Sequence, residues 1–382
     1  MAEFSEMIPV ARPTLEVGGA LEADMKDVLA SGQITNGRHV AEFEERVAEY
    51  LGVPSVVAVS SCTTGLLLLL RCLVDEGEVI LPSWTFMASG HAVVWNGLDP
   101  VFADCAPDTF AVDAKSVSER MSERTGAVLA VHVFGSPCDV DALSRDVALP
   151  VVVDAAHGFG GVYPDGTMIG TKGVAEVFSL SPTKPLTAGE GGLIATRDRD
   201  LAARLRVARE YGNPGTYDSE FFGLNGRMTE LSAVLGKANL VSLPFWLTRR
   251  RALAARYQEN LKALPGISFQ RVPEGGESTY KDMTLLVDRD ALGLSRDGLA
   301  AALKEDGVDT RRYFAPPMHQ QRAYRQACST MAALPHTEAL AERVLTVPLH
   351  SHMPEEVVDR VCEAIHRLHR HGPEVTAALG RV

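Results

Sequence analysis

The segment Val151-Val152-Val153-Asp154-Ala155-Ala156-His157 decides the fold class of this 382-residue chain. It opens with a run of apolar, β-branched residues. Such a run, bounded by turns, is typical of a strand that is buried on both faces of a mostly parallel sheet. An acid at the end of a buried strand costs free energy unless it has a partner. The segment therefore predicts a buried strand whose carboxyl end holds a carboxylate that is either functional or a helix cap.

Strands and helices are predicted to alternate on both sides of this segment. The predicted strands are Val53–Val59, Val79–Leu81, Pro100–Ala103, Ala127–His132, Pro150–Asp154, Val174–Ser179 and Gly192–Thr196. The predicted helices are Leu21–Leu29, Val40–Leu51, Thr64–Leu73, Met87–Trp95, Val112–Arg124, Val140–Asp146, Leu201–Glu210 and Thr229–Glu259, the last interrupted near Pro244. This alternation predicts an α/β fold that binds its ligands beyond the carboxyl ends of the strands.

The last third of the chain has a different pattern of predicted strands and helices. Strands at Thr284–Val287 and Thr310–Tyr313, with helices at Arg296–Lys304 and Glu355–Arg370, predict a smaller α+β domain. A chain of this length is also too long for one simple core. We therefore expect a large domain over residues 1–245 and a small C-terminal domain over residues 246–382, with the N-terminal segment able to pack on the small domain.

Composition narrows the classes of function. The formal net charge is −12, which argues against general binding of nucleic acid or an anionic membrane. The longest pure apolar run, Leu66–Leu70, is far shorter than the roughly 20 residues of a membrane span. Residues Met1–Val10 contain no apolar core of a signal peptide. The six cysteines form neither a CxxC pair nor a zinc-spaced cluster. We expect a cytoplasmic protein with free thiols and no metal site.

Lys184 lies between two predicted strands, in Phe178-Ser179-Leu180-Ser181-Pro182-Thr183-Lys184-Pro185. A lysine in such a place is by default a surface residue. Here the flanking prolines restrict the backbone, small and hydroxyl side chains leave room for a ligand, and the glycine-rich turn Gly189–Gly192 allows close approach. A lysine amine can form a Schiff base with an aldehyde cofactor, so Lys184 is a candidate anchor.

Two further side chains fit a pyridoxal phosphate (PLP) site. A carboxylate such as Asp154 beside a pyridine nitrogen keeps that nitrogen protonated, so that the ring can act as an electron sink. The alternative for Asp154 is a helix N-cap. His157 could bond a hydroxyl on the cofactor ring, and its alternative is a structural histidine.

Hydroxyl and aromatic side chains complete the candidate site. Thr63 and Thr64 lie between a predicted strand and a predicted helix, where backbone N–H groups can bind phosphate, although ordinary capping looks the same. Ser179 is a second possible phosphate ligand. Phe86 could stack on the pyridine ring or belong to the core, and Trp84 competes with it for the stacking role.

Taken together, these segments resemble the sugar aminotransferases of the DegT/StrS type, which are fold-type I PLP enzymes. The resemblance runs in order through nearly the whole chain. It is carried by Ile8–Pro13, Ser31–Gly37, Glu42–Glu44, Thr85-Phe86, Pro100–Asp104, Asp154–His157, the Lys184 segment with Gly189–Gly192, Gly223–Met228, Arg312–His319 and Val347–His350. The family implies an aspartate-aminotransferase-like fold, with a large domain built on a mostly parallel sheet flanked by helices and a smaller C-terminal domain.

The resemblance also implies roles at the matching positions. Lys184 would be the Schiff-base lysine and proton shuttle, Asp154 the partner of the pyridine nitrogen and His157 a neighbour of the ring oxygen. Thr63 and Ser179 would bind the phosphate, and Phe86 would stack on the ring. Asn225 would contact the phosphate from the neighbouring subunit, so the site would need a homodimer.

The chain departs from the family at two places. Cys62 stands where glycine is common before the phosphate-binding threonine, so Cys62 is counted among the candidate cofactor neighbours. Glu210-Tyr211-Gly212 replaces a frequent His-Gly pair in a region near the substrate.

The family implies amino transfer from an amino acid to a keto-sugar. We expect glutamate as the donor and a nucleotide-linked keto-deoxyhexose of amino-sugar or antibiotic biosynthesis as the acceptor. Three alternatives stay open: a keto-cyclitol substrate, a PLP-dependent sugar dehydratase, whose relatives carry histidine in place of the lysine, and a non-catalytic sensor on the same fold.

Overall fold

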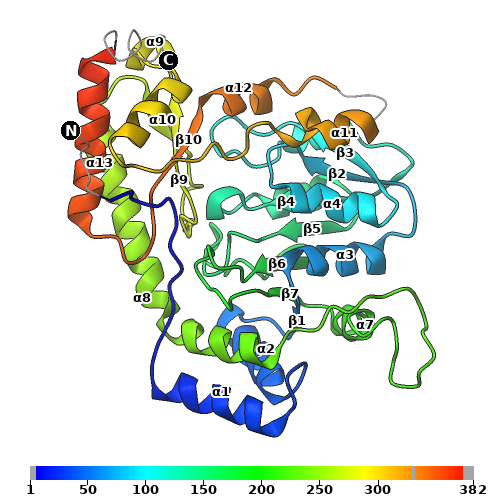
Figure 1. Cartoon of the computed structure of the whole chain (residues 1–382). Helices are drawn as coiled ribbons and strands as arrows, with labels where there is room; N and C mark the ends of the chain where they lie inside the picture. Colours follow the sequence, from blue (N-terminus) through cyan, green and yellow to red (C-terminus); the bar gives the residue numbers. More distant parts are fainter. Residues whose placement is uncertain (1–5, 328–331, 373–382) are drawn as a thin grey trace.

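The protein is represented by a computed structural model, in which residues 6–327 and 332–372 are described (Figure 1). Within these residues a seven-stranded sheet has the order β1-β7-β6-β5-β4-β2-β3. Its strands are β1 (Ser55–Val59), β2 (Glu78–Pro82), β3 (Asp99–Ala103), β4 (Thr125–Val131), β5 (Val151–Asp154), β6 (Ala175–Ser179) and β7 (Gly192–Thr196). Only β7 runs antiparallel to its neighbours in this sheet. The predicted α/β class and the mostly parallel sheet are therefore confirmed.

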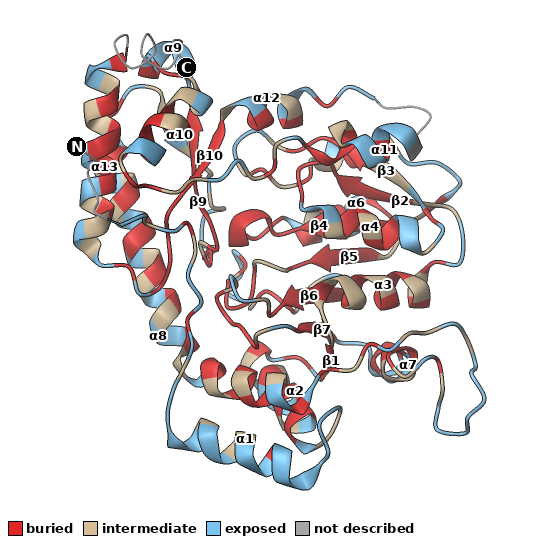
Figure 2. Ribbon diagram, in the orientation of Figure 1, coloured by how far each residue is buried: buried red, intermediate tan, exposed pale blue. Residues whose placement is uncertain are grey.

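The apolar strand sequences are explained by two cores, one on each face of the sheet. Val152 packs into the core that contains helix α3 (Cys62–Leu73) and helix α4 (Met87–Trp95). Val151 and Val153 pack into the opposite core with helix α2 (Arg38–Leu51) and helix α6 (Val140–Asp146). Because successive side chains of a strand point to opposite faces, a strand between two cores must be apolar at every position. Figure 2 shows these strands buried.

The remaining helices frame the large sheet or belong to the C-terminal part. They are α1 (Gly19–Ser31), α5 (Ala114–Ser118), α7 (Arg199–Ala208), α8 (Glu230–Leu261), α9 (Arg289–Leu292), α10 (Arg296–Glu305), α11 (Arg322–Ala327), α12 (Pro335–Arg343) and α13 (Glu355–Arg370). No helix in the described ranges combines the length and the apolar character needed to cross a membrane.

A second, three-stranded antiparallel sheet lies in the C-terminal part, with the order β10-β9-β8. Its strands are β8 (Ile267–Phe269), β9 (Met283–Val287) and β10 (Val344–Val347). A third apolar cluster joins β9 and β10 to α10, α13 and the C-terminal half of α8. The N-terminal segment lies against this part, because Ile8 pairs with Val308.

The interruption predicted near Pro244 was wrong, because helix α8 is continuous there. Its 32 residues continue through Pro244, where an interruption was predicted. Proline removes one helical hydrogen bond and favours a kink, but Leu240, Leu243 and Leu247 around it are buried in the core, and this packing carries the helix onward. Figure 1 shows α8 running from α2 to the second sheet. The domain boundary near residue 245 falls inside this helix and stays a prediction.

Two other predicted elements were wrong. The helix predicted over Val112–Arg124 is only α5, because Val112 is extended in a bridge to Cys105 and the helix begins after its Asp113 cap. The strand predicted over Thr310–Tyr313 does not form, and a single bridge joins Arg311 to Thr346. Strands β8 and β10 were not predicted.

Candidate active site

A cavity of about 360 Å³ lies beyond the carboxyl ends of the central strands. The part of its wall that precedes α8 consists of Ser61, Cys62, Thr63, Phe86, Ala88, Asp154, Ala156, His157, Ser179, Ser181, Thr183, Lys184 and Glu190. The rest of the wall, from beyond α8, consists of Lys281, Asp282, Tyr313 and Phe314. Seven of the eight candidate residues therefore meet in one cavity. Asn225 does not line it and is exposed.

Asp154 ends β5 and is buried. Its Oδ2 accepts a hydrogen bond from Ser89 Oγ at 2.6 Å, and its Oδ1 accepts one from the backbone N–H of Ala156 at 3.1 Å. No helix follows Asp154, so the carboxylate forms a local turn and is not a helix cap. Burial raises the pKa of Asp154, whereas the bond from Ser89 opposes that rise because it favours the charged form.

Lys184 lies in the loop between β6 and β7, where its N–H donates to the carbonyl of Ser181. Burial, followed by the nearby ammonium of Lys281 as a second cause, lowers the pKa of Lys184 to about 8. An amine with a pKa near neutrality is partly unprotonated at physiological pH. Lys184 can therefore act both as a nucleophile and as a base.

His157 lies among aromatic rings. Its ring is nearly parallel to the rings of Phe134 and Phe314, at centroid distances of 6.4 and 6.5 Å, and these two rings are themselves 5.5 Å apart. Burial lowers the pKa of His157 well below its ordinary value, and Lys184 adds to that effect. The imidazole is therefore neutral and can offer a single N–H or a lone pair to a neighbouring oxygen.

The start of α3 forms a candidate anion cradle. Ser61 caps this helix by accepting the N–H of Thr64 at 3.0 Å, which leaves the N–H groups of Cys62 and Thr63 without partners inside the helix. The first residue of β7, Gly192, packs so closely that a Cβ there would lie 2.5 Å from the carbonyl carbon of Ser61. Ser179 adds a hydroxyl at the end of β6.

The structure separates the two aromatic candidates for ring stacking. Phe86 lines the cavity, and half of its surface is exposed. Trp84 is fully buried and packs edge-on against Phe314 at a centroid distance of 5.8 Å. Of the two, only Phe86 can reach a ligand in the cavity.

The sequence reasoning missed several residues that line the cavity or support its wall. Ser89 lies on α4 and bonds Asp154, yet a serine in an apolar helix gives no sign of which strand end it faces. Lys281 and Asp282 form an ion pair of 2.7 Å immediately before β9. Their adjacent opposite charges before an apolar run were a visible signal, but nothing in the sequence places them beside Lys184.

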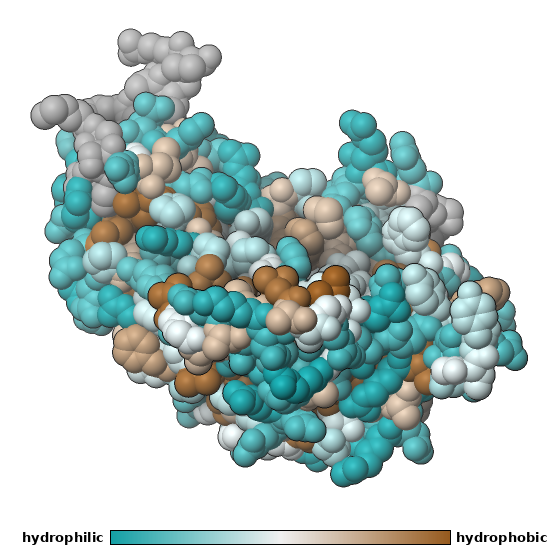
Figure 3. Space-filling view, turned by 60° about the horizontal axis from the view of Figure 1, so that its bottom comes forward, coloured by the Kyte–Doolittle hydropathy of each residue, from teal (hydrophilic) through white to brown (hydrophobic). Residues whose placement is uncertain are grey.

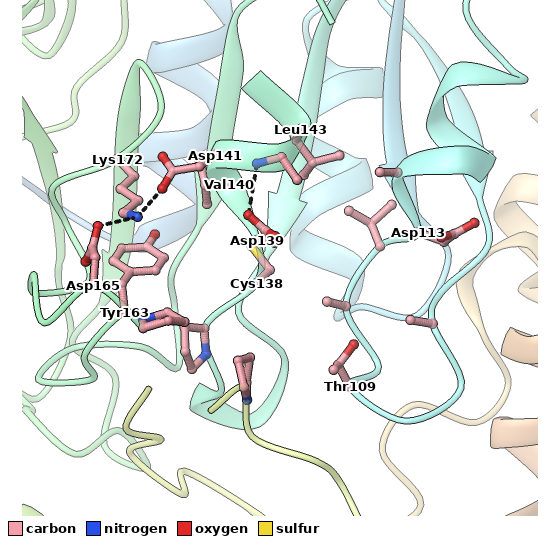
Figure 4. Close-up of a pocket in the computed structure, with 18 of the residues that line it drawn as sticks. Thr109, Asp113, Cys138, Asp139, Val140, Asp141, Leu143, Tyr163, Asp165 and Lys172 are labelled. Carbon is pink, nitrogen blue, oxygen red and sulfur yellow. Dashed lines mark hydrogen bonds and ion pairs between the residues drawn. The ribbon is translucent and has the colours of Figure 1, made fainter. Parts of the chain in front are cut away.

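A second cavity, of about 480 Å³, lies near α6 (Figure 4). Its most prominent charge, Lys172, is paired with Asp141 and with Asp165, the latter at 2.8 Å. The ammonium also lies 4.6 Å from the centroid of the Tyr163 ring. Because these polar groups satisfy one another, the second cavity has less chemistry to offer a ligand than the Lys184 cavity.

Comparison with known proteins agrees with this geometry. The model of the DegT/DnrJ/EryC1/StrS aminotransferase family matches residues 17–366. The chain belongs to this family. It is therefore a PLP-dependent aminotransferase, and the fold, family and cofactor expected from the sequence are confirmed.

Solved structures similar to this aminotransferase include three of particular interest. DesI, in the presence of its TDP-sugar product, is 38% identical over 99% of this chain and 97% of its own, with a TM-score of 0.93. DesV of S. venezuelae, in complex with a ketimine intermediate, is 32% identical over 96% and 99%, with a TM-score of 0.88. The aminotransferase TlmJ from Streptoalloteichus hindustanus is 32% identical over 98% and 100%, with a TM-score of 0.87.

The cavity of the aminotransferase fits PLP by its donor set. It supplies an amine at Lys184, a buried carboxylate at Asp154 and a helix start with hydroxyls near Thr63. These groups match an aldehyde, a pyridine nitrogen and a phosphate, which are three of the four polar parts of the cofactor, and the fourth is the ring hydroxyl. Cys62, the departure from the family, is buried at the helix start, with Sγ 3.9 Å from Asp154 Oδ1.

The second departure of the aminotransferase lies outside the cavity. Glu210 bonds Arg227 at 2.7 Å and Asn36 at 2.9 Å, and it pairs with Asn225 through the backbone. The Tyr211 side chain is exposed. Glu210 therefore holds the segment that carries Asn225.

Proposed function

We propose that the protein transfers an amino group from an amino acid, with glutamate as the expected donor, to a nucleotide-linked keto-deoxyhexose. The observation that carries the proposal is the meeting of Lys184 and Asp154 in one cavity of a chain with this family membership. The similarity to DesI, whose structure was determined with a TDP-sugar product, supports a nucleotide-linked sugar as the substrate.

The proposed roles follow from the geometry. Bound PLP would supply an electron sink at its protonated pyridine ring. Asp154 would hold the proton on the pyridine nitrogen, with its charged form favoured by the bond from Ser89. Nζ of Lys184 would bind the aldehyde and, once freed by the donor, take the proton from the donor's α-carbon. Proton transfer by a positioned side chain is worth about 10²–10⁴-fold in rate.

The other candidate residues would hold the cofactor in place. Thr63 and Ser179 would contact the phosphate at the start of α3, where the helix dipole favours an anion. Phe86 would stack on the pyridine ring, and the neutral His157 would bond the ring oxygen. Cys62 would form the floor of the site beside Asp154.

We further propose a homodimer in which Asn225 reaches the phosphate of the neighbouring subunit. Asn225 is exposed and lies outside the cavity of its own chain. Large apolar side chains are exposed as well, among them Trp95, Tyr217 and Phe222. Figure 3 shows apolar side chains at the surface of one face, and Figure 1 shows the segment after α7 projecting from the molecule. A partner subunit would cover such side chains.

The experiment that tests the function has two stages. First, purified protein should gain a visible absorption band when PLP is added, and Lys184→Ala should abolish that band. Wild-type protein that keeps no such band after free PLP has been removed would contradict the proposed anchor. Second, a panel of keto-sugars is offered with labelled glutamate. Label should enter a nucleotide-linked keto-sugar. It should not enter the same keto-sugar without its nucleoside diphosphate. Transfer to a free keto-cyclitol alone would replace the proposed substrate with that alternative.

A further inference from the structure

Lys281 and Asp282 form a buried ion pair in the wall of the active-site cavity. Nζ of Lys281 lies 2.7 Å from Oδ1 of Asp282, and the two side chains are 5% and 2% exposed. Burying two charges carries a desolvation cost that the attraction within a pair roughly repays at best. Stability alone therefore does not account for an ion pair in this position.

The second oxygen of Asp282 has no partner in the described structure. Oδ2 is buried and accepts no hydrogen bond, whereas Oδ1 is held by Lys281. A buried acceptor left without a donor costs about 1–3 kcal/mol, and more for a charged group. Since Asp282 lines the cavity, a ligand bound there can supply the missing donor.

The backbone of this pair is held in place from three sides. The fully buried guanidinium of Arg250 on α8 donates to the carbonyls of Tyr280 at 2.6 Å and Lys281 at 2.9 Å. From the large domain, the carbonyl of Phe134, in the turn that follows β4, accepts the N–H of Lys281 at 3.0 Å. Asp282 leads directly into β9. Such support fixes the position of Oδ2 before a ligand arrives, which is the condition for selective recognition.

The charges of the cavity favour a neutral donor at this oxygen. Lys281 already neutralises Asp282, Lys184 lies near Asp154, and the third carboxylate of the wall, Glu190, is exposed, so the charge of Asp282 itself is balanced. A second ammonium is not needed for charge balance. A hydroxyl group offers one donor without adding charge, and a sugar carries several.

We propose that Asp282 accepts a hydrogen bond from a hydroxyl of the acceptor sugar and that Lys281 orients its carboxylate, so that the pair selects hydroxyl-bearing keto acceptors. This inference rests on the proposed function. It adds a residue pair whose proposed contact is with the acceptor sugar and not with the amino donor.

The two half-reactions of an aminotransferase separate an effect on the acceptor sugar from an effect on the amino donor. Conversion of the cofactor from its aldehyde to its amine form by glutamate can be followed by absorbance without any sugar. The return half-reaction with the keto-sugar is followed in the same way. Asp282→Asn should lower kcat/KM of the sugar half-reaction by about 10- to 100-fold, the effect of one hydrogen bond to a charged group. The glutamate half-reaction should change much less, because Asp282 affects it only through its charge near Lys184.

The chain offers a matched control. Asp165→Asn makes the same change in the other cavity, where Asp165 pairs with Lys172 at 2.8 Å, and should leave both half-reactions unchanged. An equal fall of both half-reactions in Asp282→Asn would overturn the proposal, because the pair would then act through Lys184. An unchanged sugar half-reaction would overturn it as well.

A measurement on the wild-type protein does not depend on the folding of a variant. Acceptors that each lack one hydroxyl are compared by calorimetric binding and by kcat/KM. The acceptor that lacks the hydroxyl bound by Asp282 should bind at least about 10-fold more weakly, since Oδ2 is then left unpaired. Equal binding of the whole series would overturn the inference while the proposed function stands. If glutamate converts the cofactor and no sugar reacts, the proposed function itself fails.

Discussion

The Oγ atom of Ser89 lies 2.6 Å from Oδ2 of Asp154, and both side chains are buried. Thr85 Oγ1 lies 2.9 Å from the same serine hydroxyl. Ser89 therefore joins helix α4 to the end of β5 at the carboxylate that is proposed to hold the pyridine nitrogen. The bond opposes the rise in the pKa of Asp154 that burial causes.

Ser89→Ala should weaken the binding of PLP and lower kcat, each by about 10- to 100-fold, because the carboxylate loses a donor to its charged form. Without this donor the pKa of Asp154 rises further. The acid limb of the kcat profile should therefore move to higher pH, since a higher pH is then needed to ionise the carboxylate. The measurements are absorbance titration of the cofactor-free protein with PLP and kcat as a function of pH.

Ser83→Ala is the matched control for this prediction. Ser83 is equally buried and makes a 2.6 Å bond, but to Nδ1 of His319 and not to Asp154. It should lower the free energy of unfolding by about 1 kcal/mol and leave the acid limb in place. If the two variants shift the limb alike, Ser89 does not act through Asp154.

The sequence was informative where local pattern decides the structure. The run Val151–Val153 had to be a doubly covered strand, and its structure, β5, ends at Asp154 as expected. Lys184 was placed in a tight loop by its flanking prolines. Packing over long distances decided the rest. Pro244 did not stop α8 because core contacts outweigh the loss of one helical hydrogen bond.

Long-range packing also decided which residues form the wall of the active site. Lys281 and Asp282 reach the cavity because the buried Arg250 of α8 holds their backbone, and no local pattern encodes that meeting. Tyr313 was expected in a strand but turns into the cavity instead. Asn225 was named through the family resemblance, and its exposed position in one chain leaves its role as a prediction.

Gly192→Ala should disturb the proposed phosphate cradle. A Cβ at this position would lie 2.6 Å from the backbone nitrogen of Cys62, closer than real contacts allow. The start of α3 must shift, at a cost of about 1–3 kcal/mol in the free energy of unfolding. We expect the affinity for PLP to fall at least about 10-fold. The measurements are denaturant unfolding and cofactor titration. Gly19→Ala adds a Cβ into open space at the start of α1 and should lower neither quantity.

Lys281→Met should raise the pKa of Lys184. Burial, the larger cause of the lowered value of about 8, remains, but the repulsion from Lys281 disappears and Asp282 is left as an unpaired anion. Only the unprotonated amine attacks an aldehyde. The rate at which cofactor-free protein recombines with PLP should therefore fall at pH 7, by about tenfold for each unit of the rise, and recover at high pH.

The control for this pH dependence is Lys172→Met, which removes a lysine paired with two carboxylates in the second cavity. It should leave the recombination profile unchanged. A profile of Lys281→Met that shifts to lower pH would show that the ion pair as a whole, and not its ammonium, governs Lys184.

Asn225 should act across the subunit boundary. In the proposed dimer each site combines Lys184 of one chain with Asn225 of the other. Asn225→Ala should bind PLP about 10-fold more weakly, because a hydrogen bond to a charged phosphate is lost. A mixed dimer of Asn225→Ala with Lys184→Ala contains one site with both changes and one with neither. Refolding the two variants together should thus restore tight cofactor binding and activity in about half of the sites of each mixed dimer. If sedimentation shows that mixed dimers form but binding and activity are not restored, Asn225 acts in the site of its own chain or in no site.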